Sequence, residues 1–332
     1  MQTLSEQNQL VYEPIPLDEI RAAQRRIAGA ALRTPLVRLD VDDAPAEIYL
    51  KLECLQPIRS FKMRGAYNAM AKLAESDPAA LADGVWTASA GNMAQGVAWS
   101  ARQLGVASSV VVPETAPETK IAAVRRYGGE VIKVPVADWL QIFRTRQREG
   151  MTGLFVHPYS DPAVMAGNGV AGLEILEDLP DVDAVVVPWG GGGLCCGIAS
   201  AIKALKPECA VYAGEVDTGA PLAPSLEAGT PVEVPYTPNF VDGIGAPFVN
   251  EEMFDLARRL VDGSLVVDTT ATAAAMRLII ERNRVVPEGA GAVSVATALA
   301  GMAGGGKVVV CLVSGGNVDF GRLVTLLQGG VP

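Results

Sequence analysis

The sequence predicts an α/β protein whose parallel sheets are covered by helices. Short apolar runs rich in valine and isoleucine recur along the 332 residues, and alanine-rich segments of helical length separate them. These runs are apolar throughout instead of alternating with polar residues, which is typical of parallel strands buried on both faces. In such folds ligands bind at the carboxyl ends of the strands.

The expected elements follow this alternation along the chain. We expect strands at 48–53, 85–88, 109–113, 131–135, 184–188, 211–215, 265–267 and 308–313. The clearest helical segments between them are 93–104, 119–127 and 271–283. Each run is short and ends in a turn, as expected for strand and helix in alternation.

Composition and charge limit the classes of function. Hydrophobic residues make up 49% and charged residues 19% of the chain, which is typical of a packed globular protein. A net charge of −10 argues against a nucleic-acid partner, because phosphates require a basic face. The uncharged stretches 184–202 and 289–306 are rich in glycine and alanine, and we interpret them as buried strands and helices, not membrane spans.

The cysteines indicate a reducing compartment. Their number is odd, and their spacing suits neither a zinc site nor a redox CxxC motif: Cys54, Cys195, Cys196, Cys209 and Cys311. We expect buried thiols in a cytoplasmic protein.

A lysine at the start of a helical segment is the first candidate for chemistry. Lys62 follows Phe61 directly, and Arg64 lies two residues further on. An aromatic neighbour that excludes water and a nearby cation both lower the pKa of an ammonium group. A lysine perturbed in this way is a competent Schiff-base nucleophile. An ordinary surface lysine is the alternative.

A run of four glycines lies between a predicted strand and a helix. Gly190, Gly191, Gly192 and Gly193 precede Leu194, and such a turn can direct several backbone N–H groups to one point at the positive end of a helix. That arrangement suits a phosphate monoester. The run lacks the lysine and Ser/Thr of a P-loop, and a flexible turn is the alternative.

Two further strand ends carry polar residues. After the strand at 85–88, Ser89, Ala90, Gly91 and Asn92 offer backbone amides to a carboxylate, and Asn92 can donate to a phenolic oxygen. An ordinary helix N-cap is the alternative there. After the last strand, the Ser314 hydroxyl can meet a ring nitrogen, and a turn is the alternative.

Taken together and in this order, the four segments resemble the fold-type II pyridoxal-phosphate enzymes, most closely the threonine/serine dehydratase and serine racemase group. The resemblance runs from Thr34 to Asn317 and includes segments 157–159, 166–169, 242–244 and 287–292. It implies a fold like that of tryptophan synthase β. A large cofactor domain would comprise 1–67 and 159–332, and a small mobile domain, 68–158, would close over the substrate and exclude water.

The resemblance implies a role for each matching residue. Lys62 would bind the aldehyde of pyridoxal 5'-phosphate and move the Cα proton. Ser89, Ala90, Gly91 and Asn92 would hold the substrate carboxylate. The remaining cofactor contacts would be made by Phe61, Asn92, Gly190, Gly191, Gly192, Gly193, Leu194, Gly243 and Ser314.

Two residue choices narrow the implied reaction. A hydroxyl such as that of Ser314 does not stabilise a protonated pyridine, so the ring is a weak electron sink and β-elimination is favoured. Ala90 occupies the place of a serine in the racemases, and an alanine cannot transfer a proton. We therefore expect a dehydratase that converts threonine, serine or a relative such as phenylserine to a 2-oxo acid and ammonia. A racemase and a non-catalytic ligand-binding protein are the alternatives, and a homodimer is expected.

Some positions depart from the pattern of the group. Met93 replaces a histidine, and Arg59 replaces a glycine before Ser60. The usual metal site pairs a glutamate with an aspartate six residues later, but Glu215 is followed at that distance by Pro221. We therefore assign no divalent metal, with Glu215 as the one candidate ligand, and allow a monovalent cation. The only histidine, His157, receives no catalytic role.

Overall fold

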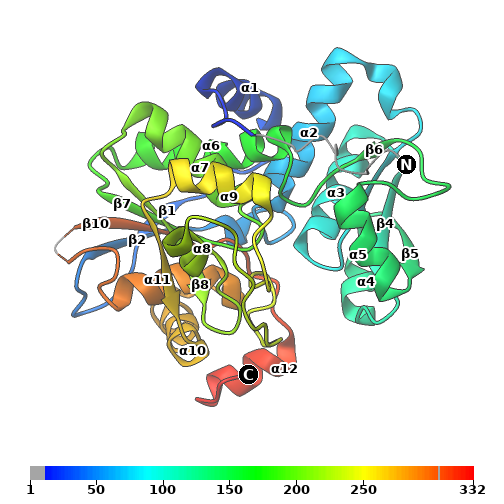
Figure 1. Cartoon of the computed structure of the whole chain (residues 1–332). Coiled ribbons are helices and arrows are strands. Elements are labelled where there is room, and N and C mark those ends of the chain that lie inside the picture. Colours follow the sequence, from blue (N-terminus) through cyan, green and yellow to red (C-terminus); the bar gives the residue numbers. More distant parts are fainter. Residues whose placement is uncertain (1–11, 306) are drawn as a thin grey trace.

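The structure, a computed structural model, describes residues 12–305 and 307–332, apart from the side chain of Arg144, and forms two sheets flanked by helices (Figure 1). The larger sheet has six strands in the order β1-β2-β10-β7-β8-β9, and only β1 is antiparallel to its neighbour. Its strands are β1 (Leu36–Arg38), β2 (Glu47–Lys51), β7 (Ala184–Pro188), β8 (Ala210–Val216), β9 (Gly263–Val267) and β10 (Val308–Leu312).

Helices cover both faces of this sheet, as the uniformly apolar strands require. Along β7, Val185 and Val187 face one core cluster, while Ala184 and Val186 face the other. The first cluster includes α1 (Leu17–Ile27), α6 (Pro162–Asp178), α7 (Gly193–Leu205) and α9 (Glu251–Leu260). The second includes α10 (Thr269–Leu278), α11 (Gly289–Leu299) and a residue of α12 (Phe320–Leu327). The short α8 (Leu222–Ala228) follows β8 and contributes to the first cluster.

The smaller sheet has four strands, all parallel, in the order β5-β4-β3-β6. Its strands are β3 (Val85–Ala88), β4 (Ser108–Pro113), β5 (Glu130–Val134) and β6 (Leu154–Phe155). Helices α3 (Asn92–Leu104) and α4 (Glu118–Arg126) pack on one face, and α5 (Val136–Thr145) packs on the other. All four strands fall within residues 68–158, whose boundaries as a domain stay a prediction.

Helix α2 (Lys62–Ser76) joins the two sheets, because it packs on α3 of the small one and on α6 of the large one. Short 3₁₀ turns, η1 (Glu53–Leu55) and η2 (Pro78–Leu81), lie on either side of it. Figure 1 shows α2 between the two groups of elements. A residue at the start of α2 therefore lies where both parts of the molecule meet.

The expected α/β class with two mostly parallel sheets is confirmed. Every expected strand is present, but β1 and β6 were not expected. The segment 271–283 is not one regular helix, because α10 passes into a π-helical turn, η3 (Ile279–Asn283). In the described residues no helix is long and apolar enough to cross a membrane, and the cysteines are buried and free. Gly306, at the end of one uncharged stretch, lies outside the described residues.

Candidate active site

The candidate site forms where the start of α2 meets the end of β10. Ser60 pairs with Gly315 in an isolated antiparallel bridge, and the Phe61 N–H donates to the Ser314 carbonyl at 3.1 Å. Lys62 follows as the first residue of α2. The structure thus brings Lys62 and Ser314 together although 252 residues separate them along the chain.

The Lys62 side chain is partly buried and lies against apolar surface. Its Nζ donates to the Pro158 carbonyl at 2.7 Å and lies 5.1 Å from the centroid of the Phe61 ring. Burial lowers the pKa of Lys62 from 10.5 to about 8, and the charge of Glu288 acts in the opposite direction. About a tenth of the amine is therefore neutral at pH 7, far more than for an ordinary lysine.

The expectation that Arg64 helps to lower this pKa is wrong, because its side chain faces the opposite way. The buried guanidinium donates to Glu53 at 2.7 and 2.9 Å and to Glu174 at 2.8 Å. Residues two apart on a helix do not share a face. The Arg64 charge is compensated in the core, and desolvation alone lowers the pKa of Lys62.

The glycine turn lies beside Lys62 through the segment that carries Pro158. A Cβ atom added to Gly191 would lie 2.2 Å from the ring of Tyr159, and one on Gly193 would lie 2.4 Å from the Tyr159 carbonyl oxygen. Gly192 has φ +88°, in the left-handed region, and its added Cβ would lie 2.5 Å from Trp189. Only glycine fits these positions. The turn runs directly into α7, whose first N–H groups have no partner within the helix, which suits a phosphate.

The loop after β3 also ends at a helix N-terminus. Gly91 is the N-cap of α3, and no side chain caps this helix, so the alternative of a cap by Ser89 or Asn92 is wrong. The Ser89 hydroxyl instead accepts the Gly91 N–H at 3.2 Å, and the Ser89 N–H donates to the Val111 carbonyl at 3.1 Å. Two of the loop amides are therefore engaged within the protein.

Two residues that the sequence did not select contact Asn92. The Asn92 Nδ2 donates to Glu288 Oε1 at 2.8 Å, and the Asn92 Oδ1 accepts from Asn317 Nδ2 at 2.8 Å. Glu288 lies against two glycines, since a Cβ on Gly315 would be 2.3 Å and one on Gly243 3.3 Å from Glu288 Oε1. Burial raises the pKa of Glu288 to about 7. The resemblance covered Glu288 only within segment 287–292 and gave it no role, and its proximity to Asn92 is a property of the fold.

The departures from the pattern of the group have structural explanations. Met93 is buried in the core against α2, where an apolar side chain packs without a desolvation penalty. Arg59 is exposed and has φ +59°, a conformation that explains why glycine is usual there. His157 Nδ1 accepts the N–H groups of Tyr159 and Ser160, and burial lowers its pKa to about 3. His157 is therefore neutral and structural.

Glu215 does not present a free carboxylate to a metal. Its two oxygens accept the N–H groups of Leu222 and Ala223 at 3.0 and 2.9 Å and the Ser264 hydroxyl at 2.6 Å. These donors occupy both Glu215 oxygens. The second acidic ligand of the group is absent, because its position is Pro221 here. No group of three His, Cys, Asp or Glu residues in the described part of the chain is placed to hold a metal. The donor set does not fit the divalent cation of the group.

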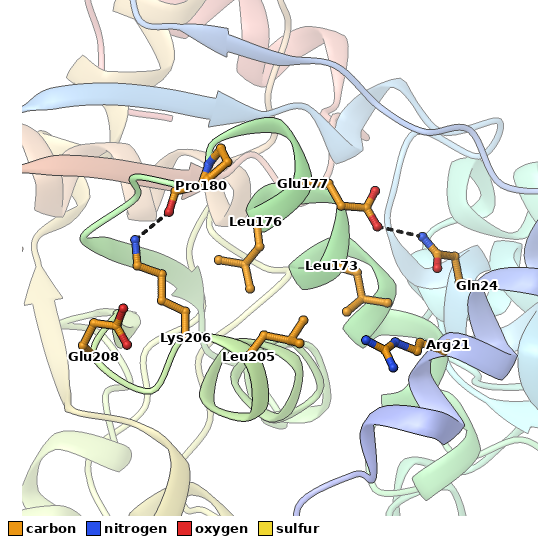
Figure 2. A pocket seen from close by; sticks show the side chains of 9 residues that line it. All are labelled: Arg21, Gln24, Leu173, Leu176, Glu177, Pro180, Leu205, Lys206 and Glu208. Carbon is orange, nitrogen blue, oxygen red and sulfur yellow. Dashed lines mark hydrogen bonds between the residues drawn. The ribbon is translucent and has the colours of Figure 1, made fainter.

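A separate groove of about 560 Å³ lies between α1, α6 and α7, away from these residues. Figure 2 shows leucines along its floor, with Lys206 bound to the Pro180 carbonyl at 2.6 Å and Gln24 bound to Glu177 at 3.5 Å. None of the predicted site residues lines it.

Comparison with known proteins agrees with this geometry. Residues 27–315 match the family described as pyridoxal-phosphate dependent enzyme. The chain is 40% identical over 320 residues to the L-threonine ammonia-lyase of Thermotoga maritima, covering 96% of this chain and 79% of that protein. The structure of maize serine racemase matches with a TM-score of 0.86 and 34% identity, covering 96% and 98% of the two chains. The structure of the T.th. threonine deaminase matches with a TM-score of 0.84 and 38% identity, covering 92% and 99%.

The fold and the site therefore define a pyridoxal-phosphate-dependent enzyme of fold type II. Within that class the chain belongs to the threonine dehydratase and serine racemase family. The residues present fit the cofactor: a lysine with a lowered pKa, and a glycine turn that leads into the N-terminus of α7, which no side chain caps and which favours an anion. The expected family, cofactor and class of enzyme are confirmed.

Proposed function

We propose that this enzyme is an ammonia-lyase that acts on L-threonine, L-serine or a β-hydroxy relative such as phenylserine. The observation that carries the proposal is Ala90, which lies in the loop between β3 and α3 and has no group that transfers a proton. A racemase needs such a group on the second face of Cα. The identity to an L-threonine ammonia-lyase supports the same choice.

The reaction is an elimination without net oxidation. The bound cofactor supplies an electron sink for the pair released when the Cα–H bond breaks. The neutral Lys62 amine accepts that proton, and the β-hydroxyl leaves as water by taking up one proton, so that the proton gained by Lys62 is balanced by the one given to the leaving group. Hydrolysis of the resulting enamine releases ammonia. Threonine thereby gives 2-oxobutanoate and ammonia. The lowered pKa of Lys62 supplies the neutral base that this step requires.

We further propose the following site. Gly190, Gly191, Gly192, Gly193 and Leu194 hold the phosphate, and Phe61, Gly243, Asn92 and Ser314 surround the ring. Ser89, Ala90, Gly91 and Asn92 form the loop that receives the substrate carboxylate. The uncapped N-terminus of α3 supports that role because it favours an anion. Residues 68–158 act as a mobile unit that closes the site.

We also propose a cytoplasmic location and a homodimeric state for the enzyme. Buried free cysteines support a reducing cytoplasm. A homodimer is the common arrangement for enzymes of this kind. We also propose that the enzyme can bind a monovalent cation, since the engaged carboxylate of Glu215 argues only against a divalent one.

The decisive experiment measures ammonia and 2-oxo acid released from L-threonine, L-serine and L-phenylserine by cofactor-saturated enzyme. Lys62→Ala is expected to lose turnover. Lys72→Ala is the matched control on the same helix, because Lys72 is only half-buried and pairs with Glu19. D-amino acid without oxo acid would establish a racemase instead. If borohydride reduction leaves no stable cofactor adduct on Lys62, a non-catalytic binding protein would be favoured.

A further inference from the structure

A continuous chain of hydrogen bonds fixes the orientation of the Asn92 side chain. Asn317 Nδ2 donates to the Ile58 carbonyl at 2.9 Å and to Asn92 Oδ1 at 2.8 Å. Asn92 Nδ2 in turn donates to Glu288 Oε1 at 2.8 Å. Both ends of the Asn92 amide are therefore engaged by residues distant in sequence.

The polarity of this chain follows from its first member. A backbone carbonyl accepts hydrogen bonds and never donates, so Asn317 must turn its NH₂ group toward Ile58. The same NH₂ group then faces Asn92, which must present its oxygen there and its nitrogen on the other side. Glu288 accepts from that nitrogen. One N–H of Asn92 remains available to an oxygen acceptor in the site.

This chain of hydrogen bonds also connects the two sheets. Asn92 begins α3, which packs on the small sheet, whereas Glu288 precedes α11 and Asn317 follows β10 of the large sheet. A second link runs parallel to it, because Asp242 pairs with Lys120 of α4 at 3.0 Å and with Arg322 of α12 at 3.2 Å. The orientation of Asn92 is thus set by the part of the molecule that carries Lys62 and the glycine turn.

Packing alone does not explain a carboxylate at position 288. Glu288 is 8% exposed and touches the space over Gly315 and Gly243, where an apolar side chain would lie without a desolvation penalty. Its polar contacts are the Asn92 amide and the backbone N–H of Asn317. A buried acceptor is retained where a donor must be held in place.

We propose that Asn317 and Glu288 are positioning residues that hold Asn92 as a hydrogen-bond donor toward the ring hydroxyl oxygen of the cofactor. This inference rests on the proposed function for the placement of the ring. Asn317 and Glu288 thus form a clamp on Asn92 that acts across the two sheets. The Asn92 N–H is aligned only when α3 lies against the large sheet. A displaced α3 carries Asn92 away from both partners and weakens the contact with the ring oxygen.

The test uses Asn317→Asp in the cofactor-loaded enzyme. Aspartate has the same shape but cannot donate to the Ile58 carbonyl or to Asn92, so Asn92 must rotate and present its oxygen to the site. Asn283→Asp is the matched control, because Asn283 also donates to a backbone carbonyl, that of Arg38 at 3.0 Å, and accepts from the Asp40 N–H at 3.2 Å, so its partners lie outside the Asn317–Asn92–Glu288 chain. The control substitution should change neither the fold nor the attachment of the cofactor to Lys62.

The first readout is the pH titration of the absorbance bands of the bound cofactor. Loss of a donor to the ring oxygen raises the proton affinity of that oxygen, and we expect a shift of about tenfold in proton concentration toward higher pH for Asn317→Asp. The control should titrate as the wild type does. The second readout is hydrogen exchange of the amides at 89–96, which should accelerate in Asn317→Asp alone, because the clamp across the sheets is lost.

A pair of variants at position 288 provides a rescue. Glu288→Gln keeps an oxygen acceptor for Asn92 and is expected to keep slow exchange at 89–96, whereas Glu288→Leu is expected to lose it. Equal exchange and equal titration in wild type and Asn317→Asp would overturn the proposal. Treatment of each sample with borohydride, which reduces a Schiff base on Lys62, separates a failure of this proposal from a failure of the proposed function. An unmodified wild-type Lys62 would overturn both proposals. If wild-type Lys62 is modified, the titration and exchange results test the role of Asn317 and Glu288 alone.

Discussion

Arg64 and Glu53 meet in the core through two hydrogen bonds, from Nε at 2.7 Å and from Nη2 at 2.9 Å, with both side chains buried. The same guanidinium binds Glu174, and Glu174 also pairs with Lys51 at 2.6 Å. Two buried cations thus balance two buried carboxylates. The cluster ties α2 to α6 and to the turn after β2, and so it fixes the helix that begins with Lys62.

Replacement of Arg64 should therefore destabilise the whole fold. Arg64→Met leaves two buried carboxylates with one cation, and we expect a loss of about 3–5 kcal/mol in the free energy of unfolding. Urea denaturation followed by circular dichroism measures this. Arg125→Met is the control, since Arg125 forms an exposed pair with Glu118 whose loss costs at most about 1 kcal/mol. Equal stability of the two variants would contradict this view of the core.

The sequence could not predict this cluster, and the reason is physical. The lysine and its neighbours could be selected as candidates, because a local motif of aromatic and basic residues at the start of a helix is visible in the sequence. The partners of Arg64 are 11 and 110 residues away, so nothing local showed that the arginine faces the core and not the Lys62 amine. The role of Glu288 was hidden in the same way, since its partner Asn92 is 196 residues distant.

The strands were predictable to different degrees for a similar reason. A buried strand such as β7 is apolar on both faces, and this alone identifies it. β6 has two residues, and β1 has three that are only partly buried or exposed, so neither produces a recognisable pattern. The glycine turn was predicted from composition, but the tight contact of Gly191 and Gly193 with Tyr159 is visible only in three dimensions.

The close approach of Tyr159 to Gly191 makes the turn intolerant of any side chain. In Gly191→Ala the new Cβ would lie 2.2 Å from the Tyr159 ring, so the turn must move. If the overpacking cost of about 1–3 kcal/mol falls on the cofactor-binding form of the turn, it corresponds to roughly a fivefold to 150-fold loss of cofactor affinity. Titration of apoenzyme with pyridoxal phosphate, followed by the intrinsic fluorescence of the four tryptophans, measures it. Gly263→Ala is the control, because its Cβ would meet Tyr212 at an ordinary 3.7 Å and should leave affinity unchanged.

The lowered pKa of Lys62 should appear in the pH dependence of cofactor uptake. The neutral amine is the nucleophile, so the rate at which apoenzyme takes up pyridoxal phosphate should rise with pH and reach half its maximum near pH 8, instead of near the ordinary lysine value of 10.5. Glu288→Gln should move the midpoint to lower pH, because the Glu288 charge raises the pKa of Lys62. Stopped-flow absorbance measures the rate, and a midpoint above pH 10 would refute the shift.

The same shift affects the stability of the apoenzyme. The folded pKa of Lys62 is below its unfolded value, so between about pH 8 and 10.5 the unfolded chain binds more protons at this group. The contribution of Lys62 to the free energy of unfolding therefore rises with pH across that window. Subtracting the pH profile of Lys62→Met apoenzyme from that of the wild type isolates this contribution, and a difference that stays flat from pH 8 to 10.5 would rule it out.

The engaged carboxylate of Glu215 predicts that divalent cations are dispensable. Leu222, Ala223 and Ser264 already satisfy both of its oxygens, so chelation with EDTA should leave turnover and thermal stability unchanged. Glu215→Leu should instead lower stability by about 1–3 kcal/mol, because buried donors lose their acceptor. The melting temperature with and without EDTA checks both effects. Activity that falls with EDTA and returns with Mg²⁺ alone would contradict the prediction.

Ala90 offers the most direct test of why the enzyme should eliminate and not racemise. It is partly buried against the core of the small sheet, in the loop that leads to α3, and Ala90→Ser adds one hydroxyl with little change in volume. If Ala90 lies on the second face of Cα, that hydroxyl returns a proton there, and a positioned acid/base group contributes about 10²–10⁴-fold. We expect D-serine formation from L-serine to rise at least about tenfold relative to 2-oxo acid, since an imperfectly placed group delivers only part of that factor. Chiral chromatography measures the ratio, and Ala90→Val controls for added bulk because it adds more volume than serine but has no proton to give. A ratio that rises equally in both variants would show that loop geometry, and not the missing hydroxyl, decides the outcome.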